Sequence, residues 1–374
     1  MAERDPRNAE IQRLRKQLAE SQNRINAIEN SMEKAKKTRK KIIKGIVIFF
    51  IIGAIVSGGV CFAMFGIHDF WDGPSCTYNE EGYCSVCKKS LFEFVLKDDA
   101  TYMVKCKDYI DYYPESVSIP STYKGKPVTS IGDSAFNECG YLQTITIGNS
   151  VTSIGDSAFY KCTSVTNVTI PDSVTNIGDS AFFNCSLTNV TIPDSVTSIG
   201  DSAFNYCRYL QSITIGNSVT NIGDYAFSNC ISLTNVTISD SVTNIGDSAF
   251  SRCTSLTNVT IPDSVISIGD YAFNGCYYLQ SITIGNSVTT IAEGAFYGCY
   301  MLESAIIPKS VTSIGEYSFY DCAYLKIFYE GTVEEWDAIG VKTWGEGVYF
   351  YSETEPISSG YYWHYGDNGE AVIW

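Results

Sequence analysis

Hydrophobic residues return at regular intervals over residues 128–328, and polar residues are interleaved with them. In one unit the apolar Leu210, Ile213 and Ile215 are interleaved with Ser212 and Thr214. Successive side chains of a β-strand point to opposite faces of the sheet. The pattern therefore predicts a short strand in each unit, with one face buried and the other exposed.

The remainder of the same unit predicts two further elements. A turn at Gly216–Asn217 is followed by a second short inward-facing stretch over Val219–Ile222. Asp224 then stands where it could cap a single helical turn, Tyr225–Phe227. We expect this turn to bring Phe227 and Cys230 into the core.

Cysteine marks the length of the repeat. Nine of the 14 Cys recur every 23 residues, with a single interval of 22: Cys139, Cys162, Cys185, Cys207, Cys230, Cys253, Cys276, Cys299 and Cys322. A period in this range is typical of solenoids, in which each unit buries its apolar face against its neighbours. We therefore predict a repeat solenoid, mostly β with short helical turns. Stacked cysteines would have parallel Cβ vectors, which suit disulfides poorly, so we expect buried thiols.

The repeated block SIGDSAFYKCTSVTNVTIPDSVTNIGDSAF resembles the BspA-like class of leucine-rich repeat proteins. The resemblance extends over about residues 90–374 and includes a capping rung before the repeats and an aromatic cap after them. It implies a cell-surface protein with an adhesive, protein-binding role, and nothing in the repeats indicates catalysis.

An uncharged run of 23 residues, Gly45–Ile67, precedes the repeats. At about 1.5 Å per residue it is long enough to cross a hydrocarbon core of roughly 30 Å as a helix. A buried helix of a soluble domain and a cleaved signal peptide are the alternatives, but a signal peptide would begin nearer the N-terminus. Seven Lys and Arg residues crowd the stretch 34–44 before this run, which predicts a cytoplasmic N-terminus and an extracellular C-terminal repeat domain in the cell membrane.

The charge distribution supports the same division. Residues 1–67 hold 13 Lys and Arg against 6 Asp and Glu, a net charge of +7, whereas residues 68–374 hold 13 against 35, a net charge of −22. The basic run favours contact with membrane lipid through residues 34–67, and the acidic exterior argues against a nucleic-acid partner. Heptad spacing over residues 8–33 predicts a homodimer through a coiled coil, or else an amphipathic helix that lies on the inner leaflet.

Cysteine and histidine gather once more just outside the predicted membrane span. His68, Cys76, Cys84 and Cys87 have the spacing of four ligands to a structural zinc ion. A disulfide among these cysteines, or free thiols, are the alternatives. The predicted order along the chain is then a cytoplasmic basic stub (1–44), a transmembrane helix (45–67), a Cys/His knuckle (68–90), an N-terminal capping rung (91–127), the solenoid (128–328) and an aromatic C-terminal cap (329–374).

The sequence favours binding over catalysis. The chain has only 2 His, and the Gly-Asp-Ser motif recurs in several rungs without a repeated base beside it, so we expect no enzyme activity. Tyrosine is frequent on recognition surfaces, and the candidate ligand-binding residues are Tyr206, Tyr209, Tyr277, Tyr278, Tyr300 and Tyr324. These tyrosines could instead only cover the turn. We expect a protein or glycan ligand; a structural spacer in the cell envelope without a specific ligand is the alternative.

Overall fold

The computed structural model describes residues 91–106, 115–340, 347–353, 361–366, 368 and 370–373. The predicted N-terminal stub, the 45–67 span and the 68–90 knuckle lie outside these residues. The chain divides into two units, Met1–Pro74 and Ser75–Trp374, and all described residues belong to the second. Among the residues that the structure describes, none of the helices could span a bilayer.

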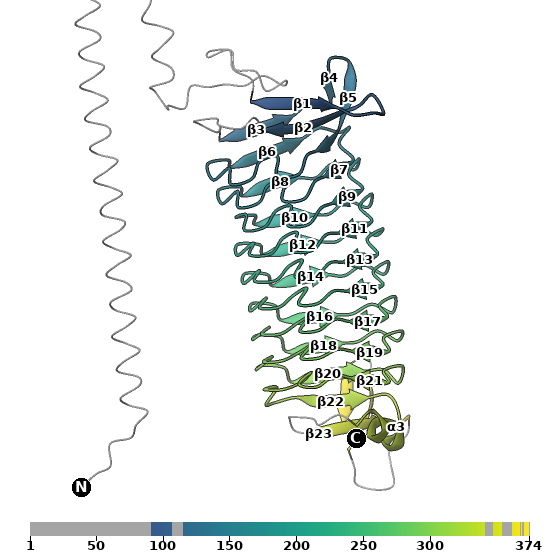
Figure 1. Cartoon of the computed structure of the whole chain (residues 1–374). Coiled ribbons are helices and arrows are strands. Elements are labelled where there is room, and N and C mark those ends of the chain that lie inside the picture. Colours follow the sequence, from purple (N-terminus) through teal and green to yellow (C-terminus); the bar gives the residue numbers. More distant parts are fainter. Residues whose placement is uncertain are drawn as a thin grey trace, which may run out of the picture. The chain divides into compact units, whose positions relative to one another are not determined.

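One face of the repeat array is a twelve-stranded sheet built from successive rungs (Figure 1). From β5 onward its strands pair in parallel, and equivalent residues of successive rungs lie opposite each other, as in the pair Ile222 and Ile245. The strands, in order across the sheet, are β1 Phe92–Leu96, β2 Tyr102–Cys106, β5 Lys126–Ile131, β7 Ser153–Ile154, β9 Asn176–Ile177, β11 Ser198–Ile199, β13 Asn221–Ile222, β15 Asn244–Ile245, β17 Ser267–Ile268, β19 Thr290–Ile291 and β21 Ser313–Ile314, with β4 Thr122–Tyr123 against β5.

The second column of strands forms three consecutive sheets. Its strands hold the interleaved pattern of the sequence, and Ile213 of β12 lies between Val190 and Val236 of the neighbouring strands. The first sheet contains β3 Ser116–Ile119, β6 Thr144–Ile147 and β8 Asn167–Thr169; the second contains β10 Asn189–Thr191, β12 Ser212–Thr214 and β14 Asn235–Thr237; the third contains β16 Asn258–Thr260, β18 Ser281–Thr283, β20 Ser304–Ile307, β22 Lys326–Tyr329, β23 Gly347–Tyr351, β24 Tyr362–Tyr365 and β25 Ala371–Ile373. The predicted repeat solenoid is thereby confirmed.

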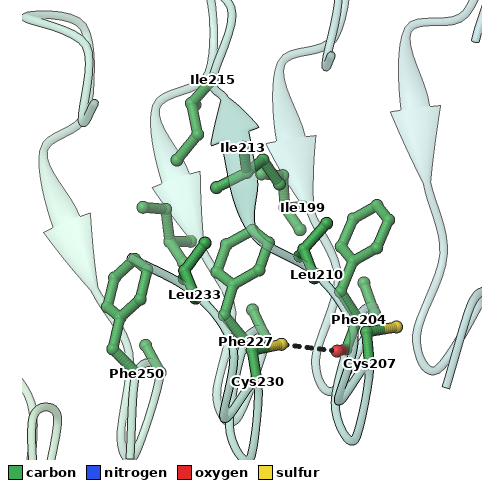
Figure 2. Packing of buried hydrophobic residues seen from close by; sticks show 14 of the residues in the cluster. Ile199, Phe204, Cys207, Leu210, Ile213, Ile215, Phe227, Cys230, Leu233 and Phe250 are labelled. Atoms are coloured by element: carbon green, nitrogen blue, oxygen red, sulfur yellow. Dashed lines mark hydrogen bonds between the residues drawn. The ribbon is translucent and has the colours of Figure 1, made fainter. Parts of the chain in front are cut away.

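The core between the two columns is a set of ladders, in which equivalent apolar residues of successive rungs lie next to each other (Figure 2). Leu210, Ile213, Ile215 and Phe227 are all buried, as the sequence predicts. The phenylalanines stack in an unbroken column from Phe136 to Phe319, with centroids of successive rings 5.2–5.5 Å apart. Parallel stacking with an offset is a favourable arrangement for aromatic rings.

The recurring cysteines are buried, which confirms the prediction of buried thiols. Cys230 Sγ donates a hydrogen bond of 3.3 Å to the carbonyl oxygen of Phe204 in the preceding rung (Figure 2), and the other rungs from Cys162 to Cys322 repeat this bond. No disulfide joins the cysteines of the described residues. Burial raises the pKa of Cys207 to about 12, so the thiol is protonated at neutral pH.

The predicted helical turn at Tyr225–Phe227 is wrong. Tyr225 has a φ of 56°, which is left-handed, and its N–H bonds to the carbonyl oxygen of Asp247 in the next rung at 2.8 Å. Phe227 N–H bonds in the same way to Ala249, whereas Ala226 closes a tight turn on Gly223. A helix would require each of these N–H groups to bond within its own segment. Here every second N–H group, that of Tyr225 and that of Phe227, bonds to the following rung instead.

The aspartate of this loop also has a different role from the predicted one. The Asp224 carboxylate accepts a hydrogen bond of 2.7 Å from the N–H of Asp247, one rung further on. The same bond recurs from Asp133 to Asp270. The aspartate therefore joins neighbouring rungs and does not cap a helix of its own rung.

Both ends of the array are covered by elements that differ from the repeats. At the start, β1 pairs antiparallel with β2, and the Phe94 ring stacks on Tyr123 with centroids 3.8 Å apart. At the other end, helix α3 (Val333–Ile339) begins with a capping box formed by Thr332 and Glu335. Buried Trp363 donates its Nε1 hydrogen to the carbonyl oxygen of Tyr329 at 3.1 Å. Such caps keep the apolar core of the end rungs from water.

Candidate functional site

Each rung turns sharply at a residue that stands two positions after its core phenylalanine. This turn position has a positive φ, between 54° and 69°, in all nine rungs: Glu138, Lys161, Asn184, Tyr206, Asn229, Arg252, Gly275, Gly298 and Asp321. Glycine is the usual residue at positive φ because it has no Cβ. Seven rungs nevertheless hold other residues there, so this backbone conformation does not by itself require glycine at 275 and 298.

Both glycines line a groove that extends across four rungs near the C-terminal end of the array. Its volume is about 630 Å³, within the usual size of small-molecule sites. It is lined by Arg252, Tyr271, Asn274, Gly275, Tyr277, Tyr297, Gly298, Tyr300, Tyr317 and Tyr320. We call this surface the tyrosine groove.

Two columns of stacked rings form much of the groove lining. In one column Tyr277 stacks on Tyr300, with ring centroids 5.2 Å apart. In the other Tyr297 stacks on Tyr320 at the same distance, and Tyr317 meets Tyr320 edge to face at 5.9 Å. The solenoid aligns each column because equivalent positions of successive rungs lie side by side.

Gly298 lies in the sequence between Tyr297 of one column and Tyr300 of the other, and Gly275 has the equivalent position in the preceding rung. A Cβ built on Gly275 would lie 3.5 Å from Arg252 Cγ and from Tyr277 Cε1, and one on Gly298 would lie 3.9 Å from the Tyr300 ring. These are ordinary contact distances, so a side chain could fit at either position and would fill the space. A side chain at position 275 or 298 would therefore narrow the groove.

The polar groups of the groove are a guanidinium, an amide and phenol hydroxyls. Arg252 is exposed and forms no ion pair with any residue that the structure describes. Asn274 Nδ2 donates to Ser251 Oγ at 3.5 Å. Tyr271 Oη donates to the Glu293 carboxylate at 2.6 Å, and this bond raises the pKa of Tyr271 because ionisation would break it.

A second hollow lies along the second column of strands and has a different lining. Its volume is about 490 Å³, and threonines of β10, β12 and β14 line it together with Asp172, Asp194 and Asp240. One Asp194 oxygen accepts a hydrogen bond of 2.8 Å from the N–H of Asn217. No aromatic residue lines this hollow.

The candidate tyrosines of the sequence separate into two groups in the structure. Tyr277 and Tyr300 line the groove. Tyr206, Tyr209, Tyr278 and Tyr324 do not line it, and Arg208 lies over the Tyr206 ring with its guanidinium carbon 5.3 Å from the centroid. The proposed zinc ligands His68, Cys76, Cys84 and Cys87 are outside the described residues.

Sequence reasoning missed most of the groove, including Arg252, Asn274 and the tyrosines at 271, 297, 317 and 320. A signal was present, because alignment of the rungs on their core phenylalanine shows consecutive glycines at the turn position only at 275 and 298. Within the described residues, no group of three or more His, Cys, Asp or Glu is placed to hold a metal ion.

Comparison with known proteins identifies the repeat. The family described as "BspA type Leucine rich repeat region" matches the chain in six copies, over residues 129–257 and 244–336. Among curated proteins, none matches this chain.

Several solved structures are similar to it. A leucine-rich repeat protein from Bacteroides ovatus is 27% identical, covers 70% of this chain and 88% of its own, and has a TM-score of 0.38. The T. pallidum leucine-rich repeat protein is 25% identical, with 68% and 95% covered and a TM-score of 0.40. A leucine-rich cell surface protein from Faecalibacterium prausnitzii is 27% identical, with 67% and 96% covered and a TM-score of 0.30.

Proposed function

The chain belongs to the BspA-type leucine-rich repeat family, and from this premise we propose that it is a cell-surface binding protein whose tyrosine groove holds a protein or glycan ligand. The observation that carries the proposal is the pair of glycines at 275 and 298. They leave a groove beside two aromatic columns, at a turn position where every other rung has a side chain. A concave surface with aromatic walls and a few polar groups is the usual form of a ligand site.

The rest of the proposal concerns how the groove is displayed. Residues 45–67 would cross the cell membrane once, with the N-terminus in the cytoplasm, and the acidic repeat domain would face the exterior. Residues 34–67 would contact membrane lipid, residues 8–33 would pair two chains, and a zinc ion on His68, Cys76, Cys84 and Cys87 would order the segment between membrane and solenoid. Two chains side by side would present two grooves to one ligand, which increases the apparent affinity.

A structural spacer is the second candidate, and one feature of the array favours it. Side chains bond successive rungs to each other along the whole solenoid, as in the hydrogen bond of 3.1 Å from Thr175 Oγ1 to the Thr152 carbonyl oxygen. A rod joined in this way would resist bending without any ligand. The spacer alone, however, gives no reason for the open groove.

An array of immobilised saccharides and peptides separates the two functions. The full chain would be applied beside the double variant G275N/G298N, which fills the groove with the residue that Asn184 and Asn229 already provide at this turn position. Asparagine tolerates the left-handed conformation, so the variant should fold. The control N184G/N229G exchanges the same residue types outside the groove.

The binding function predicts at least one array ligand that the wild-type chain and the control retain and the filled variant does not. Equal patterns for all three proteins, or no ligand for any of them, would favour the spacer.

A further inference from the structure

We propose that the ligand of the tyrosine groove is a segment of a neutral glycan; this inference rests on the binding function proposed above and specifies its ligand class. Four properties of the groove lead to it: the aromatic walls, the polar groups between them, the balance of charge and the hydrogen bonds of the backbone.

The ring columns give the groove flat aromatic surfaces. Tyr300 stacks on Tyr277, but the corresponding position of the next rung is Ala323, so no ring continues the column there. The side chains of Tyr277 and Tyr300 are 42% and 48% exposed. The face of an aromatic ring carries partial negative charge, and the C–H groups on one face of a sugar ring carry partial positive charge, so the two surfaces attract each other.

The polar groups match the hydroxyls of a sugar. Arg252 provides only donors, Asn274 provides both donors and an acceptor, and the phenol hydroxyls can act in either role. A sugar hydroxyl also donates and accepts, so it can pair with each of these groups. None of the lining side chains is aliphatic apart from the stem of Arg252, which leaves little to recognise a Leu- or Val-rich segment of a protein.

The charge balance favours a neutral ligand. Arg252 is the one cationic residue among the lining residues, while the Glu293 carboxylate is hydrogen-bonded to Tyr271 and the Asp321 carboxylate is close to Tyr300. The exterior as a whole, residues 68–374, has a net charge of −22. An anionic ligand would be repelled by this field, and a cationic one would meet the guanidinium inside the groove.

The backbone of the groove argues against an extended peptide. A peptide that binds by strand addition needs unpaired N–H and C=O groups at a sheet edge. Gly275 N–H already bonds to the Tyr297 carbonyl oxygen at 2.8 Å, and Gly298 N–H bonds to that of Tyr320 at 2.8 Å. The floor of the groove is therefore hydrogen-bonded between rungs and offers no such edge.

Saturation-transfer NMR tests the proposal with defined probes: maltotriose, cellotriose and tri-N-acetylchitotriose, each added to the full chain in a zwitterionic detergent. The variant Y277T/Y300T removes one ring column and introduces the residue that Thr163 and Thr254 already provide at the equivalent position. The control Y209S removes an exposed tyrosine outside the groove, where the corresponding residues of other rungs include Ser164 and Ser232.

We expect saturation of the ring C–H protons of at least one trisaccharide by the wild-type chain and by Y209S, with affinity reduced more than about tenfold in Y277T/Y300T. Equal saturation by all three proteins would place any sugar binding elsewhere and overturn the proposal. If the array yields a groove-dependent peptide but no trisaccharide is saturated, the glycan inference fails and the binding function stands. If neither probe class depends on the groove, both fail.

Discussion

At the scale of single residues, the solenoid is stabilised by columns of identical side chains. Each core phenylalanine from Phe159 to Phe296 packs between the equivalent rings of the rungs before and after it, and Phe227 is fully buried between Phe204 and Phe250. Loss of one ring removes contacts on both sides and leaves a cavity that the neighbouring rungs cannot fill, because their own spacing is fixed by backbone hydrogen bonds.

The substitution Phe227→Ala should therefore lower the free energy of unfolding by about 3–5 kcal/mol, the usual range for truncation of a buried aromatic residue. Urea unfolding followed by circular dichroism measures this change. The control Tyr209→Ala, at a side chain that is 61% exposed, should alter the same free energy by less than about 0.5 kcal/mol. Equal losses for the two variants would contradict the stacked-column interpretation.

The thiols of the ladder should be unreactive in the folded protein. Only the thiolate is a good nucleophile, and burial raises the pKa of Cys207 and Cys276 to about 12. We expect an alkylating reagent at pH 8 to leave both cysteines unmodified in native protein and to modify both in urea, as measured by mass spectrometry of their peptides. Rapid modification of either residue without denaturant would show that the core opens.

The same pKa shift predicts a loss of stability at alkaline pH. Burial raises the pKa of Cys207 above its ordinary value of 9.0, so the protonated thiol favours the folded state. Its contribution is complete below pH 9.0 and is lost as the pH rises through about 12. The urea midpoint of the wild-type chain should therefore fall over this range, and it should fall less steeply in the variant Cys207→Ala. Parallel pH profiles for the two proteins would contradict the shift.

At the scale of elements, the distance between neighbouring rungs differs from one turn to another. In the rung of β12, the strand ends at a turn where a Cβ built on Gly216 would lie 2.4 Å from the carbonyl oxygen of Pro193. The contact involves backbone atoms of the preceding rung, so no side chain can move aside to relieve it. The loops after the cysteines are more open, and a Cβ on Gly140 would have Thr163 Oγ1 as its nearest neighbour at 3.5 Å.

These two glycines make a matched pair of substitutions. Gly216→Ala should lower the free energy of unfolding by roughly 1–3 kcal/mol, as overpacking does in cores, whereas Gly140→Ala should have little effect. Urea unfolding of both variants compares them directly. A neutral Gly216→Ala would show that successive rungs can separate by several tenths of an ångström.

The elements also show where sequence patterns predict structure well and where they do not. The strands around Ile213 and Ile222 follow from the spacing of apolar residues, because that spacing reflects which side chains reach the core. The loop at Asp224 does not, since aspartate before a short polar-apolar segment is equally typical of a helix start. Its conformation is decided by hydrogen bonds to Asp247 and Ala249 of the next rung, and a local pattern carries no information about such a partner.

At the scale of the whole molecule, the repeat makes the fold easy to predict from the sequence and the candidate site difficult to predict. The period of 23 residues predicts the solenoid, and exposed tyrosines such as Tyr277 and Tyr300 are visible in the sequence as candidates. The groove itself arises from Gly275 and Gly298, where side chains are absent, and conventional motif reading looks for residues that are present. The two consecutive glycines at the turn position become visible only when the rungs are aligned on their phenylalanines and equivalent positions are compared.

Calorimetric titration of the best array ligand into the wild-type chain and into G275N/G298N tests the central claim, that ligand binds where these two glycines open the solenoid surface. We predict that the filled variant binds at least about tenfold more weakly, while N184G/N229G binds as the wild-type chain does. The same dissociation constant for the filled variant and the wild-type chain would contradict the account.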